Sequence, residues 1–245
     1  MKKILMALVL ALVSINMMAL SNSKMREYAR FLSDRMAYEL DLSPMQYDDV
    51  YEINYDFIYS IDKVMDDVVL GYIDAIDRYY DYLDYRNDDL RYVLSNVQYN
   101  AFLNSEYFFR PVYVLRNSWN LRVYSIYNNH SFYYFDRPSG YYSYVGSHAR
   151  VYYSNGYYVN RHQNISHNAS AMKVRNHEHY SRYRLNDFGA NVRQRNEPNR
   201  VNNYRNSNQH NRAQDPRYKS DRNKVNSPSI NNRNPQPQVV RSGHR

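Results

Sequence analysis

Acidic side chains crowd the first half of the chain, and five of them recur at steps of three and four residues. Such steps place side chains on one face of a helix, which could hold cations or a basic segment. A solvated helix face is the simpler interpretation, because the sequence holds no Asp-x-Asp-x-Asp-Gly calcium loop. General acid–base catalysis would need carboxyl groups in contrasting environments within one cleft, and the spacing indicates none. The five residues are Asp74, Asp77, Asp81, Asp84 and Asp88.

Histidines are the other side chains that could do chemistry. His177 and His179 are two residues apart, and His162 and His167 precede them. Histidines without supporting hydrogen bonds bind metals poorly and unselectively, so we expect no metal site and no cofactor. The sequence also lacks the Gly-x-Ser-x-Gly, His-Glu-x-x-His and P-loop patterns of common enzyme classes. We therefore expect that the protein is not an enzyme.

Arginine and tyrosine are interleaved in the last third of the chain. Guanidinium groups neutralise phosphate or sulfate, and tyrosine rings stack on planar groups, so this segment could bind an anionic polymer. Two alternatives stay open: the segment only solvates the chain, or it folds back onto the chain's own acidic helices. The candidate polyanion-binding residues are Arg175, Arg182, Tyr183, Arg184, Arg193 and Arg195.

A short sequence pattern occurs twice, 52 residues apart, and predicts the starts of two helices. In each copy a serine can cap the helix N-terminus while a glutamine three residues later reaches back to the serine backbone, which is a capping box. Pro44 suits the first helical position, where its missing N–H costs nothing. A leucine before each serine can pack against the first turn. The predicted capping residues are Leu42, Ser43, Gln46, Leu94, Ser95 and Gln98.

Apolar residues recur every three or four positions through residues 22–110, which predicts amphipathic helices. From Pro44 the stripe runs to about residue 85, either as one long helix or with a break near Asp66-Asp67 or Gly71. The narrow stripes favour an elongated helical hairpin or a small bundle, or a hairpin that needs a second copy to bury its core. Aromatic residues on the stripe could capture apolar segments of other proteins. These candidates are Tyr47, Tyr51, Tyr55, Phe57, Tyr99 and Phe102.

Two further segments follow the helical region. Residues 111–160 are rich in tyrosine and contain the single tryptophan, Trp119, so we expect a short β-like segment. Asn155-Gly156 between two Tyr-rich runs predicts a hairpin turn, and residues 137–140 predict a second turn. Residues 161–245 hold too few apolar side chains to offset the entropy of ordering, so we predict a long disordered basic tail rich in Asn and Arg.

The start of the chain indicates export. Residues 1–21 have a positive head, an apolar run from Ile4 to Val13, and small residues before the expected cut, as in a secretory signal peptide. The chain contains no cysteine, so it can have neither disulfides nor a lipid attached to cysteine. We expect a protein of the bacterial periplasm or exterior, without a transmembrane anchor once the signal is removed.

The net charge of +8 conceals a split along the chain. Residues 24–110 carry a net charge of −9, whereas residues 111–245 carry +15. An acidic half and a basic half suggest two different partners, or one half that screens the other.

The paired Leu-Ser-x-x-Gln segments over residues 24–110 resemble the LTxxQ-motif family, to which Spy- and CpxP-like periplasmic proteins belong. Ser43 and Ser95 stand where the family has threonine, which keeps the capping hydroxyl. The resemblance implies an all-α hairpin fold, a homodimer shaped as a thin cradle, and either ATP-independent binding of unfolded proteins or sensing of envelope stress. This helical region is acidic whereas the family's cradle is basic, and the Tyr-rich segment and basic tail are not family features.

From these patterns we expect an exported, non-enzymatic envelope protein that resembles chaperones or stress proteins and binds unfolded or envelope proteins. The alternative is a surface or matrix protein that binds anionic glycan, lipopolysaccharide or nucleic acid through its basic Tyr-rich half. A third reading is assembly or adhesion through Tyr-rich hairpins.

Overall fold

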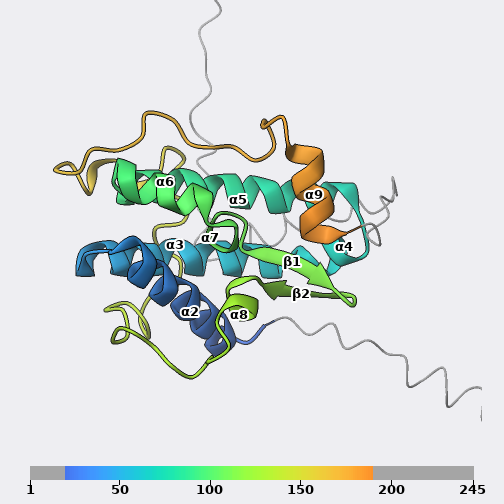
Figure 1. The fold of residues 1–245 in the computed structure, drawn as a ribbon, viewed down its shortest axis with the longest axis horizontal. Helices are drawn as coiled ribbons and strands as arrows, with labels where there is room; N and C mark the ends of the chain where they lie inside the picture. Colours follow the sequence, from blue (N-terminus) through green and yellow to red (C-terminus); the bar gives the residue numbers. More distant parts are fainter. Residues whose placement is uncertain (1–19, 190–245) are drawn as a thin grey trace, which may run out of the picture. The chain divides into compact units, whose positions relative to one another are not determined.

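Helices form most of the structure, a computed structural model that describes residues 20–189. Figure 1 shows α3 and α5 running lengthwise, with α2 beside α3. The helices α2 and α3 pack as a hairpin, and α3 packs in turn against α5. This confirms a mainly helical chain built on a helical hairpin. The α-helices are α2 (Asn22–Leu40), α3 (Pro44–Asp62), α4 (Met65–Val69), α5 (Ile73–Val93), α6 (Asn96–Asn104), α7 (Glu106–Phe109), α8 (Val123–Ile126) and α9 (Tyr180–Phe188).

The stripe that begins at Pro44 does not form one long helix but is broken, which was the second of the two predicted alternatives. Helix α3 ends at Asp62, the short α4 follows, and α5 begins at Ile73. Gly71 lies between α4 and α5 with a φ of 87°, a conformation that a residue without Cβ adopts at low cost. The turn there lets α5 pack back along α3.

One antiparallel hairpin of two strands is present in the described residues, β1 (Val112–Leu115) and β2 (Ser118–Leu121). Trp119 lies on β2, opposite Val114. The connecting residues Arg116 and Asn117 both have positive φ (51° and 60°), the geometry of a two-residue turn that matches the twist of the strands. The β hairpin is confirmed, whereas its predicted place at Asn155-Gly156 is wrong.

At Gly156 the chain instead makes a turn that leads into a short 3-10 helix, η1 (Tyr157–Asn160). The turn predicted at residues 137–140 is displaced by one residue, because the Tyr141 N–H donates to the Pro138 carbonyl at 2.9 Å.

The prediction of disorder from residue 161 onward is wrong for residues 161–189. This stretch contains α9 and places Val174 and Phe188 in the same hydrophobic core as the helices. Figure 1 shows α9 near α4 and the hairpin, and α9 packs on β1. The remainder of the predicted tail, residues 190–245, lies outside the described residues, as does most of the expected signal segment, residues 1–19.

The core is unusually aromatic, and it runs from α2 to α9 without interruption. Burial of such rings supplies large apolar areas, and ring pairs add edge-to-face contacts. No helix within residues 20–189 is long and apolar enough to cross a membrane. The fully buried aromatic residues include Phe31, Tyr51, Tyr79, Tyr80, Tyr99, Phe102, Phe108 and Tyr158.

Candidate functional site

Both Leu-Ser-x-x-Gln segments form capping boxes, at the starts of α3 and α6. The Ser43 hydroxyl accepts from the Gln46 N–H at 3.3 Å, and the Gln46 side chain accepts from the Ser43 N–H at 3.0 Å. The second box repeats this between Ser95 and Gln98, at 3.3 and 2.9 Å. Leu42 and Leu94 are buried beside them.

The two boxes also meet in space, which explains why the pattern occurs twice. The Gln46 amide donates to the Gln98 side-chain oxygen and to the Val93 carbonyl, both at 2.8 Å. The Gln98 amide donates to the Asp41 carbonyl at 3.0 Å. Asp41 and Val93 each lie two residues before the serine of a box, so the arrangement is nearly symmetric. Each glutamine therefore begins its own helix and caps a carbonyl at the end of the helix before the other box.

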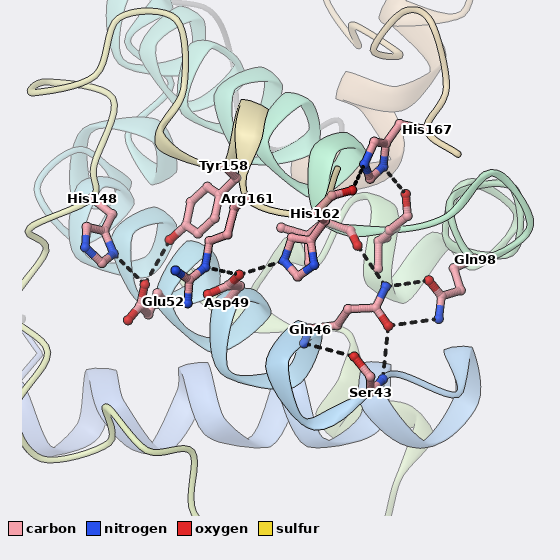
Figure 2. A network of polar contacts seen from close by, with 12 residues as sticks. Ser43, Gln46, Asp49, Glu52, Gln98, His148, Tyr158, Arg161, His162 and His167 are labelled. Carbon is pink, nitrogen blue, oxygen red and sulfur yellow. Dashed lines mark hydrogen bonds and ion pairs between the residues drawn. The ribbon is translucent and has the colours of Figure 1, made fainter. Parts of the chain in front are cut away.

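About one and two turns beyond Gln46, α3 presents two carboxylates to the second half of the chain (Figure 2). Asp49 is buried and accepts from Arg161 Nε at 2.6 Å and from His162 Nε2 at 2.7 Å. Glu52 lies 2.6 Å from a ring nitrogen of His148. The residues that contact them belong to one segment, residues 146–169, which we call the strap. The strap is therefore fastened to α3 by charge and not by apolar packing alone.

Glu52 also accepts from the Tyr158 hydroxyl at 3.2 Å. Burial raises the pKa of the Glu52 carboxyl, while the bonds from His148 and Tyr158 lower it.

The strap is fastened to α5 by an arginine that bridges two carboxylates. Arg150 Nε donates to Asp89 at 2.8 Å, and its terminal nitrogen contacts Asp88. Burial raises the pKa of the Asp89 carboxyl to about 7, even though Arg150 opposes the shift. A Cβ at Gly156 would lie 2.9 Å from the Asp89 carboxylate oxygen and 3.1 Å from the Arg150 guanidinium. The glycine that suggested a hairpin is needed because the backbone passes so close to this ion pair.

Helix α5 also carries a buried guanidinium that contacts no carboxylate among the described residues. Arg86 is enclosed by protein, and it donates to the Asn54 side-chain oxygen at 2.7 Å and to the Phe108 carbonyl at 2.9 Å. Burial lowers the pKa of Arg86 to about 9. These neutral oxygens tie α3, α5 and α7 together, so Arg86 is a structural residue.

The six aromatic residues proposed to capture other proteins are all buried in the chain's own core. Residues of the second half cover several of them: the Tyr47 and Tyr51 hydroxyls donate to the Asp136 and Tyr141 carbonyls. The Tyr99 hydroxyl accepts from the Met172 N–H. The expectation of an open stripe is therefore corrected, because residues 111–189 supply the partner surface that a second copy was expected to supply. The residues are Tyr47, Tyr51, Tyr55, Phe57, Tyr99 and Phe102.

The candidate polyanion-binding residues divide into three groups. Arg175 pairs with Asp81 at 2.9 Å and Asp77 at 3.5 Å on α5, as expected if the basic segment folds back onto the acidic helices. Tyr183 lies between the Arg110 guanidinium and the His177 ring. Arg182 is exposed and Arg184 half-buried, both on α9. Arg193 and Arg195 lie outside the described residues.

Three exposed aromatic rings contact one another, and a fourth exposed ring, Phe135, follows Tyr134 in the chain. The Tyr38 ring, 54% exposed, stacks on the Tyr134 ring at 3.8 Å, and Phe132 meets Tyr134 edge-on at 4.9 Å. Phe135, also exposed, packs on Tyr47. We call Tyr38, Phe132, Tyr134 and Phe135 the aromatic patch. The aromatic run of residues 132–135 was the available signal, but the sequence analysis assigned it to the β-like segment of residues 111–160.

A buried ion pair on α2 holds the aromatic patch in place. The Asp34 carboxylate accepts from the Tyr134 and Phe135 N–H groups at 3.2 and 2.9 Å and contacts Arg35. Arg35 donates to the Phe132 carbonyl at 2.8 Å, and its guanidinium lies 5.0 Å from the Tyr134 ring centre. Because backbone groups are held, the rings can be exposed without the loop being free to collapse onto the core.

Within residues 20–189, no group of three or more His, Asp or Glu side chains is arranged to hold a metal ion. Comparison with protein-family models, curated proteins and solved structures finds no match. The LTxxQ-like resemblance therefore stays a prediction.

Proposed function

We propose that the chain is an exported, non-enzymatic binding protein of the bacterial envelope that captures apolar segments of unfolded proteins without ATP. Its binding surface is the aromatic patch and not the helical stripe. The observation that carries this proposal is the exposure of the Tyr38 ring on α2 and of three rings on the loop 132–135, whose backbone a buried ion pair fixes.

Two physical arguments support the patch as a binding surface. Soluble proteins rarely expose several contiguous large apolar side chains, and such clusters commonly mark interaction sites. Tyrosine and phenylalanine also contribute much contact area at a small entropic cost, because few side-chain bonds must be fixed on binding. A cluster anchored through Asp34 and Arg35 is already ordered, so binding would cost little further ordering.

Polyanion binding is the rival function, and the internal ion pairs weigh against it. Arg150, Arg161 and Arg175 each contact carboxylates of α3 or α5. A guanidinium that is already paired gains little by exchanging its carboxylate for a phosphate. The basic half therefore serves first to neutralise the acidic half.

The test measures aggregation of a reduced, unfolding α-lactalbumin in the presence of the chain, at low and moderate salt. We expect the wild-type chain to suppress aggregation at both salt concentrations. We expect the double substitution Phe132→Ser and Tyr134→Ser to abolish most of the effect, because it removes the centre of the patch.

The matched control is Tyr85→Ser, which removes an exposed ring on α5 outside the patch. Suppression that persists in the double variant would contradict the proposal, as would equal loss in the control. Tight binding to heparin or DNA that weakens steeply with salt would instead favour the rival function.

A further inference from the structure

The histidines of the strap all face hydrogen-bond acceptors (Figure 2). His148 lies 2.6 Å from a Glu52 oxygen and His162 lies 2.7 Å from an Asp49 oxygen. Each of these contacts becomes an ion pair only when the imidazole is protonated. The strap is therefore fastened most strongly when its histidines carry charge.

The need for a protonated imidazole is clearest at His167, because both of its ring nitrogens face carbonyl oxygens. Nδ1 lies 3.1 Å from the Leu94 carbonyl and Nε2 lies 2.8 Å from the His162 carbonyl. A neutral imidazole has one N–H and one lone pair, so either tautomer would direct a lone pair at a carbonyl oxygen. Only the doubly protonated ring satisfies both contacts.

The position of His167 at the end of α5 also favours a positive charge. Leu94 is the C-cap residue that follows α5, and the last carbonyls of a helix carry the negative end of its dipole. Arg91, in the last turn of α5, donates to the Asn168 carbonyl at 2.8 Å, directly beside His167 in the chain. Two side chains that can carry a positive charge therefore fasten the strap at this helix end, and of the two types only an imidazole exchanges its proton near neutral pH.

Two carboxylates of α5 have the same pH preference: Asp89, which faces the strap, and Asp84, which faces Val174 just beyond it. Burial raises the pKa of Asp89 to about 7, and burial raises the pKa of Asp84 to about 6 where it accepts from the Val174 N–H. A carboxyl group whose pKa is raised in the folded protein retains a proton that the unfolded chain releases. Unfolding then becomes easier as pH rises from about 4 through that pKa. The charged groups facing the strap are Asp49 and Glu52 on α3, Asp88, Asp89 and Arg91 on α5, and Arg150 and Arg161 within the strap.

We propose that the strap is a proton-dependent latch, which is seated when His167 is protonated on both ring nitrogens and loosens as that proton is lost at rising pH. The latch would operate whatever the aromatic patch binds. Loosening it would uncover Asp49 and Glu52 on α3 and the chain at Leu94 and Asn96 around the second capping box, which the strap now contacts.

The seating of the strap has a direct local reporter. The Asn96 N–H is among the first of α6, so it has no partner within the helix, and it donates to the Ser166 carbonyl of the strap at 2.9 Å. Its protection from hydrogen exchange therefore depends on the strap. After correction for the intrinsic pH dependence of exchange, we expect this protection to fall up to tenfold per pH unit above about pH 6.5, where an ordinary histidine loses its proton.

The protonation of His167 is measured by nitrogen-15 NMR of the imidazole rings in the secreted wild-type chain. We expect both His167 nitrogens to be of the imidazolium type at every pH below the one at which the Asn96 protection begins to fall. Signals of a single neutral tautomer below that pH would overturn the proposal. This readout needs no variant, so it holds even if a substitution prevents folding.

The variant His167→Gln keeps a donor but cannot titrate. We expect the unfolding equilibrium constant of this variant to rise less steeply with pH than that of the wild type. The difference should reach up to tenfold per pH unit, because one titrating proton is removed, while the contributions of Asp84 and Asp89 persist. The control His179→Gln lies outside the strap and should leave the profile unchanged. Identical profiles for His167→Gln and wild type, with unchanged Asn96 protection, would overturn the latch.

Discussion

At the residue scale, the sequence predicted what each capping residue does locally but not what the two boxes do together. Ser43 and Gln46 are three residues apart, so their mutual hydrogen bonds follow from helix geometry alone. The contact between Gln46 and Gln98 joins residues 52 apart, and no local rule predicts it. The repeat is visible in the sequence, whereas the contact between the two boxes is visible only in the structure.

The paired glutamines lead to a prediction about coupling. We expect Ser43→Ala to cost about 1 kcal/mol of unfolding free energy, a usual value for a lost N-cap. Gln46→Ala should cost about 1–3 kcal/mol, because it leaves the buried Val93 carbonyl without its donor. Urea unfolding of Gln46→Ala, Gln98→Ala and the double variant measures the coupling.

In that cycle the double variant should cost less than the sum of the single variants, by about 0.5 kcal/mol or more, since each single change also removes the shared contact. Strict additivity would show that the two amides contribute independently, and the symmetric pairing would then have no energetic importance.

At the scale of elements, turn chemistry was the least reliable guide. Asn155-Gly156 is a strong hairpin signal, yet the hairpin forms around Arg116-Asn117, whose residues tolerate positive φ less readily than glycine. Tertiary packing determines where the hairpin forms, because β1 packs against α9 and β2 packs against α4. The glycine is explained by close approach to an ion pair, which a single sequence does not reveal.

Gly156 therefore gives a prediction at this scale. Gly156→Ala would place a methyl group 2.9 Å from the Asp89 oxygen, at a backbone φ of 89° that alanine disfavours. We expect a loss of more than 1 kcal/mol of unfolding free energy, from strain and from displacement of Arg150. Urea unfolding at pH 7 provides the measurement.

The control is Gly189→Ala, which has a similar positive φ of 71° but no atom within 4 Å of the added Cβ. A loss of equal size at both glycines would show that backbone strain alone is responsible. The Arg150 ion pair would then not explain the choice of glycine at residue 156.

At the scale of the whole molecule, average composition misjudged the second half of the chain. Residues 161–189 contain few apolar side chains, but Val174 and Phe188 are fully buried and polar groups bond to α5 between them. A compositional average cannot detect anchors that are widely spaced and partly ionic. The helical half was predicted well because its apolar residues recur with a period of 3.6. The second half was predicted poorly because its buried residues follow no such period.

Truncation tests whether the second half belongs to the folded unit. Ending the chain at residue 160 removes Asp187, which contacts Arg110 at 2.6 Å, and leaves that buried guanidinium without its most buried partner. We expect the shortened chain to lose its cooperative unfolding in urea. Near-ultraviolet circular dichroism and the fluorescence of Trp119 measure this unfolding. Losing one partner of a buried pair commonly costs about 3–5 kcal/mol.

The matched comparison ends the chain at residue 189 and keeps every contact described here. We expect this form to unfold in one cooperative transition. If the form ending at 160 unfolds with the same midpoint and steepness, the helices fold without residues 161–189, and these residues are an accessory segment.

The strap also affects how long the chain takes to finish folding. Its bond between His162 and Asp49 closes a loop of 113 residues, and the bond between Asp187 of α9 and Tyr80 closes one of 107 residues. Such distant contacts form slowly, because the entropy of closing the loop is lost before the contacts are gained. Synthesis completes the α2–α7 helices well before residue 189 emerges, so every newly made copy passes through a period in which its acidic face and its aromatic stripe are open. The speed at which the last third of the chain closes over them sets how long each copy remains exposed to its neighbours.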